Sequence, residues 1–428
     1  MFINRKYWTL LLAVCLLFAG CRKESIIPEG SPQPGEKVYS GLIPEKTDRL
    51  PRVYITTPHA INSKTEWTDS CLVRISVMVD GETSDIYSSD LVKIKGHGNS
   101  TWTAYPKKPY SMLLPEQANF IGTGKTKRWI LLANWMDRTL LRNDVAFEAA
   151  RRTCLAWTPS GTFVDVYMNG EYTGCYWLGE RIHVEGSHFT CDYLYSFDTS
   201  DRKEYDFESR YGHWKNHTAT GGIPVEIKYP DRSHYSAGQF KYVINRGKSA
   251  LFTVEETLMR GETPSLVLDL DSFCDWYIVN ELTCNKEANH PKSAFMFIRD
   301  GKLFAGPVWD FDWGTFTPDH HSLQIQSSLY YFHIWSDREF RNTLKRRWSV
   351  LKPRFETLGD YVDQRAKLIS ASETLNHRRW PCHPNPLASD DDGMVNGDEL
   401  MTFNDAVKRL KQSIEQRIEV LDAEINRL

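Results

Sequence analysis

The sequence predicts an α+β fold, with a β-rich N-terminal lobe and helices toward the C-terminus. In the N-terminal lobe, residues 50–120, apolar residues alternate or run together in segments that predict strands at 53–56, 72–79, 92–95 and 110–114. Near the C-terminus, apolar residues at spacings of three and four predict an amphipathic helix over 402–428. The 428-residue length is enough for a sizeable core with two or three subregions.

The N-terminus has the features of a secretory signal peptide over residues 1–20. Arg5 and Lys6 precede an apolar run at 7–18, which is too short for a transmembrane span of about 20 apolar residues. Small residues then lead to Cys21, and this junction resembles a bacterial lipobox. We therefore predict that Cys21 is the lipidated first residue of the mature protein. The Pro-, Gly- and Ser-containing residues 21–49 predict a flexible tether.

Helices and strands are both expected in the central part of the chain, residues 121–320. In chain order we predict a helix over 138–156, a hairpin turning at 169–170, a polar loop over 198–222, and helices at about 236–260 and 269–284. A strand at 294–298 is then expected to pair with a strand at 303–312. This second hairpin presents Asp310 and Asp312 at its far end.

The C-terminal region, residues 321–428, is predicted to be mainly helical, with its last helix packed on its own domain. Before that helix, residues 389–399 are rich in acidic side chains at spacings similar to a calcium-binding loop. Ala388 occupies the first ligand position, however, and Pro384 and Pro386 exclude an entering helix. We therefore predict an acidic surface loop.

Composition excludes some classes of function. The net charge is −3, from 52 basic and 55 acidic residues, so bulk charge gives no reason to expect nucleic-acid binding. After Cys21 the chain has seven cysteines and no CxxC pair, which argues against a zinc site or a redox motif. Neither the disulfide connectivity nor the oligomeric state follows from the sequence.

Two stretches about 200 residues apart carry the chemistry. The first, 95–110, combines a glycine-rich segment with several lysines, and Gly96 and Gly98 permit close approach of the backbone to a ligand. The second, 306–314, places Asp310 and Asp312 two positions apart, so in an extended strand both carboxylates project from one face. Paired carboxylates of this kind predict a site for a divalent cation.

Both stretches resemble the CotH kinase family, which comprises atypical protein kinases associated with spore coats and relatives among bacterial surface lipoproteins, including those of Bacteroidetes. The resemblance extends from about Val53 to about Asp319. It also includes the segments 129–135, 141–144, 170–174 and 227–231. Residues 121–320 match the kinase-like core. The resemblance implies an atypical protein-kinase-like fold.

The resemblance also implies the site residues and the cofactors, which are ATP with Mg²⁺ or Mn²⁺. Asp310 and Asp312 take the metal-binding positions, and Glu287 takes the catalytic position at which many members have aspartate. Asn289 and Ser293 are both candidates for the residue that assists metal binding. The expected phosphate-binding residues are Lys108 first and Lys228 second, together with Lys95 and Arg142.

The expected function is transfer of phosphate to Ser or Thr of an envelope or surface protein. The lipid anchor at Cys21 predicts attachment to a membrane of the cell envelope, the outer membrane being our expectation. Two alternatives stay open from sequence. One is a non-catalytic, pseudokinase-like surface lipoprotein that binds glycan or an envelope protein, which the glutamate at 287 allows. The other is a metal-dependent glycosyltransferase-like enzyme, since Asp310-Phe311-Asp312 is also a DxD pattern.

Overall fold

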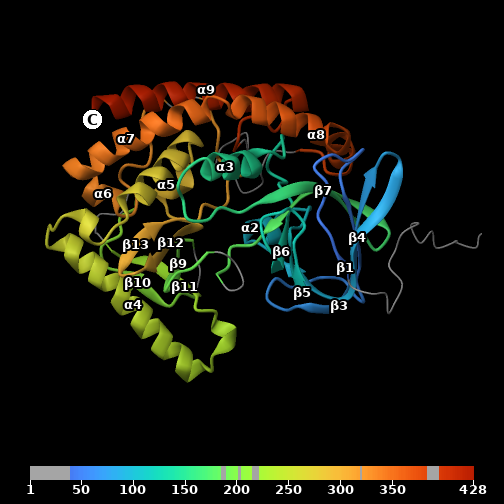
Figure 1. Cartoon of the computed structure of the whole chain (residues 1–428), viewed down its shortest axis with the longest axis horizontal. Coiled ribbons are helices and arrows are strands. Elements are labelled where there is room, and N and C mark those ends of the chain that lie inside the picture. The colour runs from blue at the N-terminus through green and yellow to red at the C-terminus, as the bar shows by residue number, and fades with distance from the viewer. Residues whose placement is uncertain (1–38, 185–188, 201–203, 215–220, 319–320, 383–394) are drawn as a thin grey trace, which may run out of the picture.

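The computed structural model describes residues 39–184, 189–200, 204–214, 221–318, 321–382 and 395–428. It contains a β-barrel, a second sheet and a layer of helices that extends over both (Figure 1). The signal peptide, Cys21 and the tether up to residue 38 lie outside the described residues. The mixed α+β architecture predicted from the sequence is confirmed.

The N-terminal lobe is a barrel of seven strands with the order β4-β3-β2-β7-β8-β6-β5, closed by pairing of β5 with β4. A short strand, β1, pairs with the outer side of β4. Buried apolar side chains of every barrel strand fill the interior. The bounds are β1 (Tyr39–Ser40), β2 (Arg52–Thr56), β3 (Thr68–Val79), β4 (Glu82–Gly96), β5 (Tyr110–Ala118), β6 (Thr126–Leu132), β7 (Gly161–Met168) and β8 (Glu171–Glu180).

The barrel continues past residue 120, where we expected the N-terminal lobe to end. Strands β6, β7 and β8 complete it, and β7 and β8 form the hairpin predicted at 169–170. Asn169 has a φ of 51° and Gly170 a φ of 86°, the backbone conformation that this pair of residues favours in tight hairpins. The helix predicted at 138–156 is shorter, α3 (Arg142–Arg151), and lies in sequence between the barrel strands β6 and β7.

The second sheet has the strand order β10-β11-β9-β12-β13 and is antiparallel throughout. Figure 1 shows it on the side of the molecule away from β1, with the long helix α4 beside it. Its apolar residues join those of the helices in the largest core. The bounds are β9 (Tyr193–Phe197), β10 (Phe207–Ser209), β11 (Ile223–Tyr229), β12 (Ala294–Arg299), β13 (Lys302–Ala305) and α4 (Ala237–Met259).

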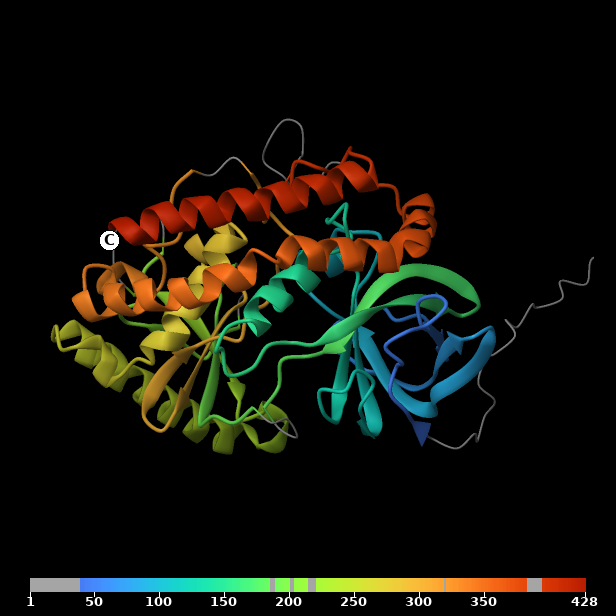
Figure 2. The same cartoon turned by 45° about the horizontal axis from the view of Figure 1, so that its top comes forward.

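The C-terminal helices form the third layer. Thr402 caps the last helix, whose apolar face packs against three other helices as the spacing predicted. Figure 2 shows this helix running along the layer from the second sheet toward the barrel. The bounds are α2 (Ser100–Thr103), α5 (Leu270–Leu282), α6 (Tyr331–Ile334), α7 (Arg338–Phe355), α8 (Leu358–Arg379), α9 (Phe403–Arg427), and the 3₁₀ turns η1 (Arg232–His234), η2 (Pro264–Leu266) and η3 (Lys286–Asn289).

Two predictions about local structure are wrong. The strand expected at 303–312 ends at Ala305, because Pro307 offers no N–H for pairing and residues 306–314 instead form a loop. The prediction of an acidic surface loop over 389–399 is wrong at the C-terminal end of this segment, where Asn396, Asp398 and Glu399 are buried. Its acidic residues 390–392 lie outside the described residues.

The described part of the chain holds no helix that is both long enough and apolar enough to cross a membrane. The seven cysteines after Cys21 are free thiols in the structure. Cys71, Cys175, Cys274 and Cys284 are buried in apolar surroundings, so packing explains their presence.

Candidate functional site

The loop after β13 brings its two aspartates together by a turn, whereas we had expected an extended strand. Asp310 has a φ of 72°, in the left-handed region that non-glycine residues seldom occupy. The Oγ of Ser293 donates a hydrogen bond to Oδ2 of Asp310 at 3.1 Å. The carboxyl of Asp312 also lies close enough to shift the pKa of Asp310, and the charge of Asp310 in turn raises the pKa of Asp312. The two carboxyl groups therefore converge.

Two asparagines from distant parts of the chain fix the backbone of this loop. The Oδ1 of Asn143, in α3, accepts from the N–H of Phe311 at 2.7 Å. The side chain of Asn396 donates to the carbonyl oxygen of Asp312 at 2.9 Å and accepts from the N–H of Gly314 at 2.8 Å. All three side-chain contacts are buried, so the left-handed turn is held from both sides.

Arg142 supports the same loop from beneath. Its guanidinium is 1 % exposed and pairs with Asp137 and with Asp398, the latter at 2.7 Å. Its Nε donates to the carbonyl oxygen of Thr315 at 3.3 Å. Because every guanidinium nitrogen already has a protein partner, the geometry does not support the phosphate contact expected for Arg142.

Four carboxyl groups form an acidic cluster, a name we use for Asp198, Glu287, Asp310 and Asp312. Burial, followed by the charge of Asp198, raises the pKa of Asp310. Burial and the charge of Asp310 raise the pKa of Asp312 well above its usual value. Burial, followed by Asp310, raises the pKa of Glu287 to about 7, while Lys292, whose Nζ lies 3.3 Å from Oε1 of Glu287, lowers it. Carboxylates gathered in this way require a proton or a cation.

Asp198 is a member of this cluster that the sequence analysis missed. It follows β9 directly, and the register pairs Phe197 with Ala294, so Asp198 lies beside Ser293 at the same end of the sheet. Its side chain is only 6 % exposed, and its Oδ1 accepts from the N–H of Ser200 at 2.9 Å. The position just after a central strand is the sequence signal that could have identified it.

The donor set fits a magnesium ion held jointly with phosphate. Within the described ranges, no three or more side chains of His, Cys, Asp and Glu are arranged to form a complete metal site. Mg²⁺ usually takes only one or two carboxylates, and phosphates and water supply the rest. Asp310 and Asp312 satisfy that requirement, and Ser293, which is hydrogen-bonded to Asp310, is a candidate assisting group. Asn289 accepts a hydrogen bond from Oγ of Ser328 at 3.2 Å.

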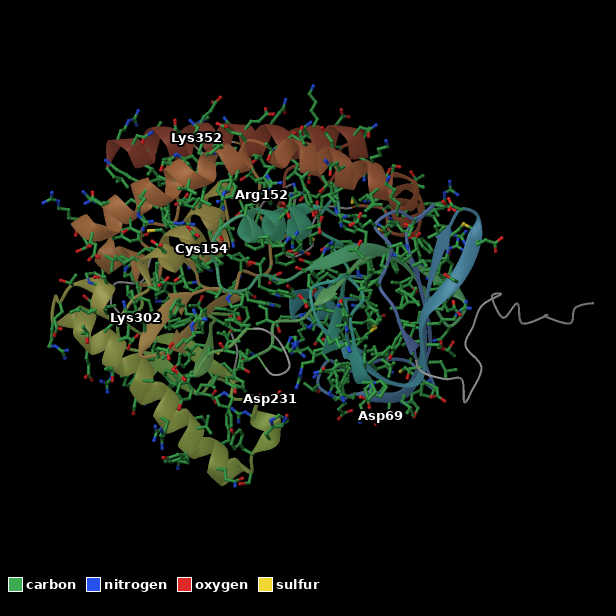
Figure 3. The ribbon with its side chains drawn as sticks, viewed as in Figure 1. Asp69, Arg152, Cys154, Asp231, Lys302 and Lys352 are labelled. Atoms are coloured by element: carbon green, nitrogen blue, oxygen red, sulfur yellow. The ribbon has the colours of Figure 1, made fainter. Side chains whose placement is uncertain are left out.

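A basic cluster lies where the barrel meets the second sheet. We use this name for Lys64, Lys95, Arg128, Arg181 and Lys228, whose charges act on the half-buried His97 or on one another. Arg128 pairs with Asp231 at 2.7 Å, and Figure 3 shows Asp231 beside the gap between the two lobes. Lys228 pairs with Glu226 at 2.5 Å.

Among the described residues in and around the basic cluster, positive charge exceeds negative charge. Burial, followed by the nearby cations, lowers the pKa of His97 to about 3, so its imidazole is neutral. Burial, then Arg181 and Arg128, lowers the pKa of Lys95, whose Nζ lies 4.6 Å from the centre of the Trp67 ring. Holding like charges together is unfavourable unless an anion binds among them.

A ring contact between the lobes links the surroundings of the basic cluster to the loop that carries Asp310. The ring of His97, in the glycine-rich stretch after β4, lies 6.4 Å from the ring of Trp309 in an edge-to-face arrangement. Trp309 directly precedes Asp310. Lys95 and Lys228, two of the expected phosphate-binding residues, thus belong to the cluster around His97, and His97 contacts the residue that precedes Asp310.

Lys108 lies elsewhere. Its Nζ donates to the carbonyl oxygen of Trp102 at 2.6 Å, and it lines an open groove of about 400 Å³ with Arg379 and Trp380. The structure therefore does not bring Lys108 into the basic cluster. Its neighbour Lys107 is fully buried and donates to the carbonyl oxygens of Ala133 and Cys175, a structural role.

Comparison with known proteins identifies the family. The family model described as "CotH kinase protein" matches residues 92–421, which include the glycine-rich stretch, the acidic cluster, every residue of the basic cluster except Lys64, and most of α9. Among curated proteins, no match to the chain was found. Since the matched region covers well over half of the chain, this protein is a member of the CotH kinase family, a family of atypical protein kinases.

Proposed function

We propose that this protein binds ATP with Mg²⁺ or Mn²⁺ between the barrel and the second sheet and transfers the γ-phosphate to a Ser or Thr hydroxyl of an envelope protein. The observation that supports this most is the contact between His97 and Trp309, which links the basic cluster around His97 to the loop that carries Asp310 and Asp312. Phosphoryl transfer needs both: cations for the phosphates, and carboxylates for the metal and the acceptor.

In this proposal, Asp310 and Asp312 hold the divalent cation, and Lys95 and Lys228 bind phosphate oxygens. The bound metal would neutralise charge on the β- and γ-phosphates. Trp309 and Phe311 shield the carboxylates from water, since Phe311 is fully buried and Trp309 packs on Phe147 with ring centres 5.7 Å apart. Excluding water strengthens each electrostatic contact in the site.

In this proposal Glu287 acts as the general base. Its carboxylate accepts the proton of the acceptor hydroxyl, the oxygen forms a bond to the γ-phosphorus, and the bond from that phosphorus to the bridging oxygen breaks to release ADP. A pKa of about 7 suits this task, because an effective base titrates near the working pH. The hydrogen-bonded pair with Lys292 holds the carboxylate in position.

Glu287→Gln is expected to lower the rate of phosphate transfer by roughly 100- to 10,000-fold while ATP still binds. In the wild type the rate should rise with pH through about 7, because the base is active only when deprotonated; the glutamine variant should lose this dependence. The measurement is transfer of radiolabelled phosphate over a pH series. Glu287→Asp, which restores the residue common in the family, is the control and should keep the pH dependence. A glutamine variant as fast as wild type would remove Glu287 from the mechanism.

Lys95→Met is expected to weaken ATP binding by about 10- to 150-fold, since a charge-assisted hydrogen bond to phosphate contributes about 1.5–3 kcal/mol. Lys108→Met is the matched control, because Lys108 belongs to the same stretch of sequence but lies in the separate groove. Calorimetric titration of both variants with Mg·ATP is the measurement. Equal losses in the two variants would show that the basic cluster is not the phosphate site.

The cellular setting is part of the proposal. Acylation of Cys21 would attach the protein to a membrane of the cell envelope, the outer membrane by our proposal, and the acceptor would be a neighbouring protein. Mass spectrometry of the mature N-terminus tests this: a diacylglyceryl group on Cys21 supports it, and an unmodified or uncleaved N-terminus contradicts it. Family membership favours phosphate transfer over the DxD glycosyltransferase alternative. Mg·ATP binding without transfer would instead indicate the pseudokinase alternative.

A further inference from the structure

Arg181 has a feature that sets it apart in the basic cluster. It is the first residue after β8, and its backbone N–H donates to the carbonyl oxygen of Arg128 at 3.2 Å, which extends the pairing of β8 with β6. In the part of the chain that the structure describes, its guanidinium has no hydrogen bond or ion pair to a protein group. A half-buried arginine usually has such a partner.

The electrostatic surroundings of Arg181 make this arrangement unfavourable without a ligand. Burial, followed by the charge of Arg128, lowers its pKa. Asp231 and Glu226 oppose this effect, but each already pairs with another cation of the cluster, Arg128 and Lys228 respectively. Arg181 therefore lies in a site with unbalanced positive charge, and an anion of several charges would relieve the repulsion.

The position of Arg181 indicates which part of a ligand it meets. Arg181 directly follows β8, Lys95 is in β4 and Lys228 is in β11, so these residues come from both lobes, and all three charges act on His97. His97 in turn contacts Trp309, the residue before Asp310. An anion among these cations thus lies close to the expected metal site, as the phosphate chain of a metal-bound nucleotide must.

We propose that Arg181 binds phosphate oxygens of the nucleotide, alongside Lys95 and Lys228. A guanidinium offers parallel N–H donors that match two phosphate oxygens, which neither lysine can do. This inference rests on the proposed function in that it takes the ligand to be ATP. The chemistry it requires is a polyphosphate.

The test compares Arg181→Met with wild type in titrations with Mg·ATP and with inorganic tripolyphosphate. Loss of Arg181 should weaken both affinities by roughly 10- to 100-fold. Arg232→Met is the matched control. Arg232 directly follows Asp231, but it is exposed and already pairs with Asp206 at 2.5 Å. It should bind both ligands as the wild type does.

Thermal unfolding separates binding from a structural role. Without ligand, Arg181→Met should unfold at the wild-type temperature or above it, because a repelled cation has been removed, and Mg·ATP should raise its unfolding temperature less than it raises that of wild type. A variant that unfolds earlier and binds both ligands normally would overturn the inference.

The two proposals can fail separately. If wild type binds Mg·ATP and Arg181→Met binds it equally well, the inference fails and the proposed function stands. If wild type binds tripolyphosphate through Arg181 but does not bind ATP, the anion site stands and the proposed function fails. If wild type binds neither probe, both are wrong.

Discussion

Asp310→Asn is expected to lose phosphate transfer by about 1000-fold or more and yet, without divalent cations, to be more stable than wild type at neutral pH. Asparagine tolerates the left-handed backbone at φ 72° and can still accept the hydrogen bond from Ser293, so the loop is preserved. It removes a charge from a buried group of carboxylates, which relieves repulsion but takes away a metal ligand.

The stability gained by Asp310→Asn should depend on pH in a definite direction. The pKa of Asp310 is raised in the folded protein, so its carboxylate destabilises the fold as pH rises above the unfolded value near 3.8. The stability gained by Asp310→Asn should therefore be present at pH 7 and vanish below about pH 3.8, as thermal unfolding over a pH series would show. Asp300→Asn, at an exposed left-handed turn, should change neither property. Full transfer activity in Asp310→Asn would contradict the site assignment.

Arg142→Met is expected to destabilise the protein by about 3–5 kcal/mol, the largest stability change that we predict. The substitution leaves Asp137 and Asp398 buried without their cation, and breaking a buried pair on one side costs about this much. The carbonyl oxygen of Thr315 also loses its donor. Equilibrium unfolding in urea measures the effect.

An exposed pair provides the control for this prediction. Arg346→Met removes the partner of Asp271 on the surface, and such pairs contribute about 0–1 kcal/mol. If Arg142→Met does not fold, the double variant Arg142→Met with Asp398→Asn should recover part of the stability, because one buried charge is then removed. A loss no greater than that of Arg346→Met would show that Arg142 does not support the loop.

Elements with a strong local pattern were predictable from the sequence. The amphipathic spacing at 402–428 gave α9, and Asn169-Gly170 gave the β7–β8 hairpin, because both signals arise from residues close together in the chain. The strand expected up to Asp312 was wrong because the apolar residues of that segment, among them Val308 and Phe311, are buried in a loop. A buried loop and a buried strand can have the same pattern of apolar residues in the sequence.

The contacts that build the site were not predictable, because they join residues far apart. Asn396 reaches the Asp312 loop from a segment that appears acidic and exposed, and only the fold shows that it is buried. Gly96 suggested room for a ligand, yet a Cβ there would lie 2.5 Å from the Trp102 ring, so the space holds protein. The resemblance to a family identified Asp310 and Glu287 as candidates. The burial and the neighbouring charges that shift their pKa values could be seen only in the structure.

Titration of the protein with ATP, in the presence and absence of Mg²⁺, tests the central claim most directly. We expect wild type to bind ATP only with the metal, and Asp310→Ala and Asp312→Ala each to lose that dependence together with most of the affinity. ATP binding that is the same in wild type and in both variants, with or without Mg²⁺, would contradict the account, because the converging carboxylates would then have no part in the site.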